Sequence, residues 1–343
     1  VDIAATLIGT GAIDASLSSI DTSLLLTESA VTNLILSLTG STLVMRIIPI
    51  AVAVAFNLDL VTQYVDPDKI DFDAINWDEE LIQIDDILSG VIRTGILQDI
   101  LVDNAGVDVI LPALFEQENA EEIGDILLSI DESPFLSQVI PAVLYGLVEQ
   151  EVAAGGPAGG LGLSTFLPTA WEDYETIEFG RELKLVYDLV YELYNDAVGL
   201  SDVLLETLTG TTAVNDAPFE APKREGETPT LTSVIVDNFD LFVEVLLGDV
   251  DEDGVPINND PVTGISINRV SMLDSDLIAR GLPSLVESLV LPTLLSVLGT
   301  DYDDTEVVSL VEGFNDGTLG DVRKAYKQEF AGLFSIVGAA LSN

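Results

Sequence analysis

Residues 33–49 of this chain read NLILSLTGSTLVMRIIP, and residues 125–141 read DILLSIDESPFLSQVIP. The two stretches align without a gap at an offset of 92 residues, with two serines and the final proline in register. Self-similarity at a fixed distance is typical of proteins built from repeated supersecondary units. The alignment therefore predicts an internal repeat.

A third copy lies at residues 275–290, which read SDLIARGLPSLVESLV and match residues 133–148. In each copy a serine stands eight residues before a proline; the pairs are Ser41 with Pro49, Ser133 with Pro141, and Ser275 with Pro283. Apolar residues after the proline recur every three or four positions, which is helical spacing. The serine suits a helix N-cap, because its hydroxyl accepts hydrogen bonds from the free amides of the first turn. The proline is expected to kink a helix or to begin one.

The predicted fold class is therefore mostly all-α: a tandem repeat of proline-kinked helical hairpins, with an irregular insertion that carries a calcium-type loop. A strand is the rival prediction for residues 50–56, where β-branched residues alternate with alanine. The matching residues 142–148 favour a helix, and repeats share a fold, so we predict a helix for both. Trp77 and Trp171 follow the first two prolines by 28 and 30 residues, and both are predicted to be equivalent core side chains.

The repeat also sets the predicted domain boundaries. They are an N-terminal arm or first helix at 1–32, repeat 1 at 33–124, repeat 2 at 125–210, an insertion at 211–264, and repeat 3 with a C-terminal cap at 265–343. Glycine and proline punctuate residues 153–162 and 210–230, which we predict to be irregular surface segments.

The sharpest local motif is residues 249–260, DVDEDGVPINND. Oxygen-bearing side chains fall at positions 1, 3, 5 and 12 of a twelve-residue loop, with glycine at position 6, and this spacing wraps hard oxygen ligands around one calcium ion. The segment resembles the calcium loops of EF-hand and dockerin modules and of extracellular Asp-rich repeats, over this loop only. The predicted Ca2+ ligands are Asp249, Asp251, Asp253, the Val255 carbonyl and Asp260. The alternative is a solvated acidic turn, and position 12 departs from the sensor pattern because it is Asp and not Glu.

Charge restricts the function classes. The chain has 59 acidic and 12 basic residues and a formal net charge of −47. Nucleic acid and anionic membranes are poor partners for such a chain, because phosphate recognition needs clustered lysine and arginine. Like charge also destabilises a compact state unless cations screen or bind it, so divalent cations are expected partners. Apolar residues make up 48% of the chain, so we expect a folded body with an acidic surface and not a disordered chain.

Catalysis is not predicted. Cysteine and histidine are both absent, which removes disulfides, thiolate nucleophiles, zinc–sulfur sites and the commonest general base. No lysine stands near a recognisable serine motif, and carboxylate pairs cannot be singled out among so many acids. The acidic clusters at 66–73 and 301–304 could each hold a cation, although such runs are more often solvated loops.

The most apolar run, residues 47–56, is about half the ~20 residues that a spanning helix needs, so no transmembrane segment is predicted in the mature chain. The predicted function is a secreted or cell-surface structural protein, stabilised by calcium, which self-assembles as a filament, sheath or surface-layer subunit and is thus a homo-oligomer or polymer. One alternative is an extracellular carrier or binding protein for an apolar ligand. A second is an acidic soluble protein of a halophile.

Overall fold

The computed structural model describes residues 27–62, 64–103, 105–154, 163–209, 231–251, 255–285 and 317–341. Within these ranges the chain is mostly helical and forms no strand, so the all-α prediction is confirmed. Two isolated bridges occur, between Val250 and Pro256 and between Asn259 and Ser266. The expectations for residues 1–26, 155–162, 210–230 and 301–304, and for Asp253, lie outside the described residues.

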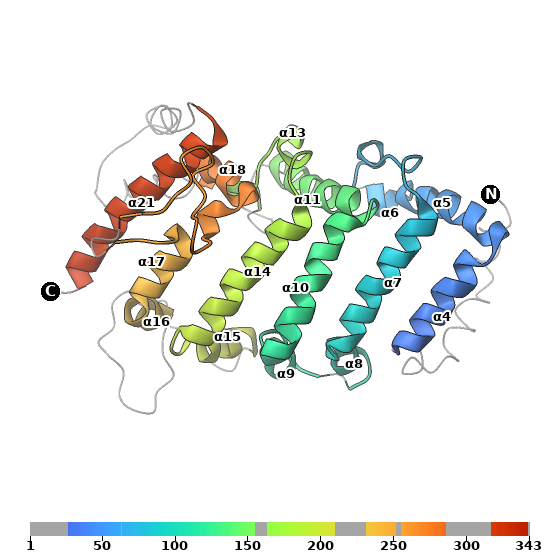
Figure 1. The fold of residues 1–343 in the computed structure, drawn as a ribbon, viewed down its shortest axis with the longest axis horizontal. Coiled ribbons are helices and arrows are strands. Elements are labelled where there is room, and N and C mark those ends of the chain that lie inside the picture. The colour runs from blue at the N-terminus through green and yellow to red at the C-terminus, as the bar shows by residue number, and fades with distance from the viewer. Residues whose placement is uncertain are drawn as a thin grey trace.

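The main helices lie side by side in a single row (Figure 1). Each helix packs against the next one in the row, and the chain runs up one helix and down its neighbour. In order, the row consists of α4 (Glu28–Thr39), α7 (Trp77–Arg93), α10 (Gln117–Glu132), α14 (Phe179–Asp196), α17 (Phe239–Leu247) and α21 (Leu319–Leu341).

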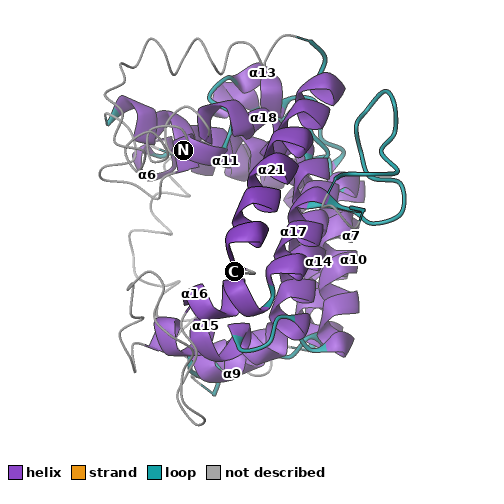
Figure 2. Ribbon diagram, turned by 90° about the vertical axis from the view of Figure 1, so that its left-hand side faces the viewer, coloured by secondary structure: helices purple, strands orange, loops and turns teal. Residues whose placement is uncertain are grey.

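Connecting elements join the row helices at the two edges of the row, and both sets project to the same side of it (Figure 2). At one edge lie α5 (Thr42–Phe56), α6 (Asp59–Thr62), η1 (Pro67–Lys69), α11 (Leu136–Ala153), α12 (Leu163–Phe166), α13 (Trp171–Tyr174), η3 (Met272–Asp274) and α18 (Asp276–Leu285). At the other edge lie α8 (Ile96–Leu101), α9 (Val107–Leu114), α15 (Leu200–Thr209) and α16 (Leu231–Asp237).

The core is divided into small clusters between neighbouring helices. One cluster joins α17, η3, α18 and α21 around Leu247 and Leu273, and another joins α11 to the segment after α5 around Ala142 and Val65. A third joins α13, α14 and α18 around Tyr174. Burial between successive neighbours is the pattern expected of stacked helical units.

Each of the three predicted cap serines accepts a backbone hydrogen bond at the start of a helix. The donor amides are Val44 for Ser41, Leu136 for Ser133 and Ile278 for Ser275. The chain turns sharply at the first two of these serines, by 99° between α4 and α5 and by 94° between α10 and α11. Pro49 and Pro141 lie inside α5 and α11, so neither proline begins a helix, and the kink expected at the proline stays a prediction. The sharp turn between helices comes earlier, next to the serine that caps the second helix.

Three further expectations have definite outcomes. Residues 50–56 lie in α5, so the helix prediction there is confirmed. The predicted irregular insertion, residues 211–264, contains the row helix α17, whose apolar residues, such as Val243 and Leu247, pack in the core. The two tryptophans are not equivalent: Trp77 is buried at the start of α7, while Trp171 begins the short α13 and is only partly buried.

Among the described residues, no single helix is both long enough and apolar enough to cross a membrane. The pairs α4–α5 and α10–α11 reach that length and composition only when taken together, across their sharp bends.

Candidate functional site

A buried carboxylate joins the first row helices to α11. Glu80, the fourth residue of α7, is completely buried. One of its oxygens accepts a hydrogen bond from the Ser133 hydroxyl at 2.5 Å, and the other accepts one from the Phe135 amide at 3.0 Å. A carboxylate is favourable at a helix N-terminus, where free amides and the helix dipole both attract negative charge. Glu80 therefore fixes α7 against the start of α11.

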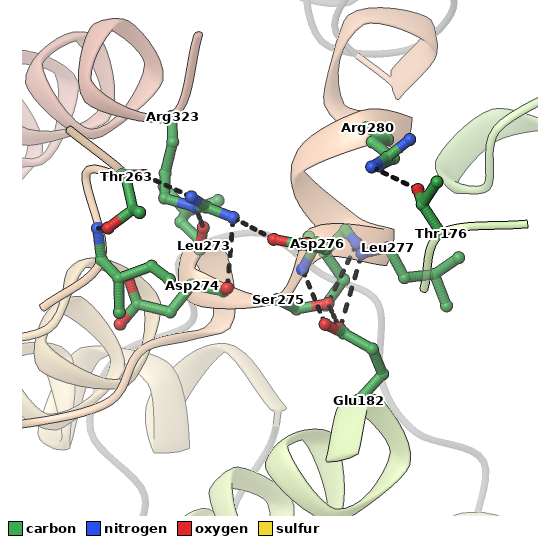
Figure 3. A network of polar contacts seen from close by, with 12 residues as sticks. Thr176, Glu182, Thr263, Leu273, Asp274, Ser275, Asp276, Leu277, Arg280 and Arg323 are labelled. Carbon is green, nitrogen blue, oxygen red and sulfur yellow. Dashed lines mark hydrogen bonds and ion pairs between the residues drawn. The ribbon is translucent and has the colours of Figure 1, made fainter. Parts of the chain in front are cut away.

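Glu182 forms the same junction further along the chain. It is the fourth residue of α14, it accepts a hydrogen bond from the Ser275 hydroxyl, and the Asp276 amide donates to it at 3.0 Å (Figure 3). Ser133 and Ser275 are two of the three serines that the alignment put in register. The sequence analysis missed both glutamates, because each bonds a serine 53 or 93 residues away and stands among 59 acidic residues.

Ser41, the first serine of the three, differs from the other two. Its hydroxyl accepts from the Val44 amide, but no acidic side chain in the described part of the chain bonds to it. Glu80, which bonds Ser133, lies on α7, the row helix that precedes α10. The equivalent partner of Ser41 would lie on a row helix that precedes α4. None is present among the described residues.

At the opposite end of the row, α21 holds the irregular segment 248–275 through a buried arginine. Arg323 donates to the carbonyl oxygens of Leu273, Thr263 and Asp274, and forms an ion pair with Asp276 at 2.6 Å (Figure 3). Only 2% of its side chain is exposed. The planar guanidinium can satisfy several fixed acceptors at once, which suits a junction between a loop and a helix.

Lys327, one helical turn further on, binds the same irregular segment, and we call Arg323 and Lys327 together the clamp. Its ammonium lies within hydrogen-bond distance of Asn259 Oδ1 (3.1 Å), Ser266 Oγ (2.8 Å) and Asp274 Oδ1 (2.7 Å). Burial lowers the pKa of Lys327, and the bond to Asp274 partly opposes that shift. Three acceptors match the three N–H groups of the charged form, so the side chain is held as a cation.

The contact between Ser266 and Lys327 does not support a serine–lysine nucleophile. Such a pair needs a neutral amine that accepts the serine proton, whereas this lysine donates to an almost completely buried carboxylate. The Ser266 side chain is itself buried, so a substrate would not reach it. The geometry is that of a structural junction.

The predicted calcium ligands lie in the same segment. Asp251 and Val255 bond to each other, with the Asp251 amide donating to the Val255 carbonyl and the Val255 amide donating to Asp251 Oδ1. Asp260 Oδ1 accepts from Val262 and Thr263, and these bonds lower the pKa of Asp260. Asp249 Oδ2 is buried without a hydrogen-bond partner. No three acidic side chains among the described residues are grouped closely enough to hold a metal ion, so the calcium site stays a prediction.

One face of α5 exposes a row of large apolar side chains. Leu43, Ile47, Ile50 and Val54 form one stripe with steps of four, three and four residues, and they are 69%, 49%, 64% and 56% exposed. The matching positions of α11 are covered. Ala142 packs with Val65 and Ile70, and Gly146 lies directly under the Tyr64 carbonyl.

This uncovered face is also electrically unusual. Residues 29–58 contain no acidic residue, which is the longest such stretch in the chain, and Arg46 is their only charged side chain. Arg46 is exposed and has no ion pair with any described residue. Every other lysine or arginine in the described ranges forms an ion pair or lies over an aromatic ring. The α5 face is therefore an apolar surface without acidic groups, and its one cation has no ion pair in the described part of the chain.

Comparison with models of known protein families, with curated proteins and with solved structures finds no match to this chain.

Proposed function

We propose that this chain is a structural protein of the cell surface or extracellular space that assembles with copies of itself into a filament, sheath or layer. The observation that carries the proposal is the uncovered stripe of α5. A contiguous exposed apolar surface on an otherwise strongly acidic protein marks a contact site. Burial of such surface stabilises a complex by roughly 25 cal/mol per Å2 of apolar area removed from water.

The proposal includes a tandem repeat of three helical units as the architecture that assembles. It is supported by the three capping serines and by the two glutamates, Glu80 and Glu182, which bond to successive members of that set. Stacked repeats bury their faces against neighbouring repeats, so a terminal unit without a neighbour exposes its contact face. Among the described residues no unit precedes α4 and α5, and the stripe of α5 is exposed there.

Calcium belongs to the same proposal, with Asp249, Asp251, Asp253, the Val255 carbonyl and Asp260 as its ligands. The spacing of these residues and the unpartnered oxygen of Asp249 support it. A divalent cation here would reduce the repulsion within a chain of net charge −47. Isothermal titration with CaCl2 should detect binding that Asp251→Ala weakens, and heat signals identical to those of buffer alone would remove calcium from the proposal.

Sedimentation velocity over a range of protein concentrations tests the assembly. We expect the wild-type chain to associate as concentration rises and Ile50→Glu to remain monomeric, because a charge on the stripe opposes its burial. Ile82→Glu is the matched control, since Ile82 on α7 is similarly exposed (56%) but lies outside the α4–α5 face. A wild-type chain that is monomeric at every concentration, with and without calcium, would disprove self-assembly.

A further inference from the structure

We infer that Lys327 of the clamp forms a covalent isopeptide bond with the Asn259 side chain, with Asp274 carrying the proton and Ser266 stabilising the oxygen that becomes charged. The inference comes from the way these four polar side chains meet in one place. It concerns the C-terminal end of the helix row and does not depend on self-assembly.

The two groups that would react are already in contact. Lys327 Nζ lies 3.1 Å from Asn259 Oδ1. A carbonyl bond is about 1.23 Å long, so Nζ lies within about 4.3 Å of Cγ, the carbon that it attacks. The two residues are 68 positions apart in the chain, and the fold brings them together. Groups held in contact react as if each were present at a very high concentration, which accelerates a condensation that is slow in solution.

Asp274 is the base for this reaction. An ammonium has no lone pair, so Lys327 must lose a proton before it attacks. Asp274 Oδ1 is 2.7 Å from Nζ, and the Asp274 and Lys327 side chains are only 2% and 1% exposed. Burial lowers the pKa of Lys327, so its proton is removed at a smaller cost in free energy than that of a lysine in water. The ion pair between the two side chains is therefore the state from which the reaction starts.

Ser266 lies where negative charge develops during the attack. As Nζ bonds to Cγ of Asn259, the amide oxygen takes up the electron pair of the carbonyl double bond. The Ser266 hydroxyl is 3.4 Å from that oxygen and 2.8 Å from Nζ, and Ser266 is buried. A hydroxyl that donates to the oxygen stabilises the developing charge in a site with little water.

The reaction needs no oxidant and no second molecule. The bond from Lys327 Nζ to Asn259 Cγ forms, and the bond from Cγ to the amide nitrogen breaks. Of the three hydrogen atoms on the Lys327 ammonium, one stays in the new amide, and two leave with the Asn259 nitrogen as an ammonium ion. Asp274 receives one of these protons, passes it to the leaving nitrogen and is a carboxylate again at the end.

A cross-link of this kind suits a chain without cysteine. Disulfides cannot form in it, and side chains of α21 hold the irregular segment 248–275. A covalent bond between residues 259 and 327 would stabilise the folded state because it restricts the unfolded chain. Unlike a disulfide, it would persist in a reducing medium.

Mass spectrometry of the purified chain tests the inference. The intact mass should be lower than the mass of the sequence by one ammonia molecule. Trypsin cuts after lysine and arginine but not after a lysine whose amine is blocked, so residues 225–269 and 325–343 should be recovered as one linked pair of peptides. Separate peptides from folded wild type, or a link from Lys327 to any residue other than Asn259, would overturn the inference.

Variants assign the roles of the residues. Asn259→Ala and Lys327→Arg should fold, as circular dichroism reports, and should give no linked peptides, because each lacks one reacting group. Asp274→Asn should lower the linked fraction by about tenfold or more, and an undiminished fraction would overturn its role as the base. Asn258→Gly is the matched control, because Asn258 is exposed and glycine accepts its φ of 53°, and it should keep the linked peptides. Linked peptides that persist in Asn259→Ala would overturn the assignment of Asn259.

Discussion

The two ends of the helix row differ in which side chains are buried and which are exposed. At the C-terminal end, α21 buries Arg323 and Lys327 and uses them to hold the irregular segment 248–275 against the row. At the N-terminal end, α5 leaves four large aliphatic side chains exposed and carries one arginine, Arg46, which has no ion pair with a described residue. We call the C-terminal end closed, because its arginine and lysine are buried, and the N-terminal end open, because its apolar side chains are exposed.

The two ends also place their basic side chains in different environments. Twelve bases cannot neutralise 59 acids, so their placement matters more than their number. Lys327 contacts a carboxylate, Asp274, that is only 2% exposed, and in that environment each charge depends on the other. Arg46, by contrast, forms no ion pair with any residue that the structure describes.

The largest expected effect is at the closed end. Lys327→Met should lower the free energy of unfolding by about 3–5 kcal/mol, because Asp274 is left as a buried charge without its cation. Urea unfolding monitored by circular dichroism measures the change. Lys184→Met removes an exposed ion pair with Asp188 instead, and should cost less than about 1 kcal/mol. Equal losses from the two variants would mean that the clamp is no stronger than a surface pair.

The next effect compares α11 with α5 at matching positions. Gly146→Val should destabilise the protein by about 1–3 kcal/mol, because a Cβ at residue 146 would lie only 1.9 Å from the Tyr64 carbonyl oxygen. Valine already occupies the corresponding position, Val54, where it is exposed. Val54→Gly should cost only about 0.5 kcal/mol through helix propensity. Both changes are measured by urea unfolding at a protein concentration below that of assembly; a tolerated Gly146→Val would show that α11 is not tightly covered.

Sequence patterns predicted the local features of this comparison and missed the distant ones. The helix at residues 50–56 and the capping role of Ser41 follow from spacing and side-chain chemistry within a few residues, and both are present. Glu80, Glu182 and Lys327 act on groups at least 53 residues away, and no pattern within one segment distinguishes them from the other charged residues. Exposure of α5 is equally nonlocal. It depends on the segments that pack on the helix: Val65 and Ile70 pack against α11, whereas no described segment covers the stripe of α5.

A smaller difference is expected at the serine junctions. Ser133→Ala removes the hydroxyl that donates to buried Glu80, and should cost about 1–2 kcal/mol because the carboxylate loses a donor it cannot replace with water. Ser41→Ala removes an N-cap with no acidic partner among the described residues, and should cost about 0.5–1 kcal/mol. Thermal unfolding of the two variants at one pH tests the order, and the reverse order would argue against a structural role for the Glu80 junction.

The smallest effect is the acid response of the closed end. Hydrogen bonds from Thr263 and Val262 lower the pKa of Asp260, and bonds from Thr318 lower that of Asp321. A carboxylate with a lowered pKa in the folded state stabilises the protein above its unfolded pKa of about 4, and that contribution is lost as the pH falls through the lowered value. Acid therefore weakens the turn at residues 260–264, while residues 29–58 contain no carboxylate that could respond.

Asp260→Asn is the variant that isolates this response. Asparagine keeps the side-chain oxygen that accepts from Thr263 but does not titrate, so its unfolding free energy should fall less steeply than that of wild type below pH 4. Acid also reduces the net negative charge of the whole chain, which stabilises wild type and variant alike, so only the difference between their pH profiles reports on Asp260. Parallel profiles would mean that these bonds do not persist in solution, and that the closed end depends on Arg323 and Lys327 alone.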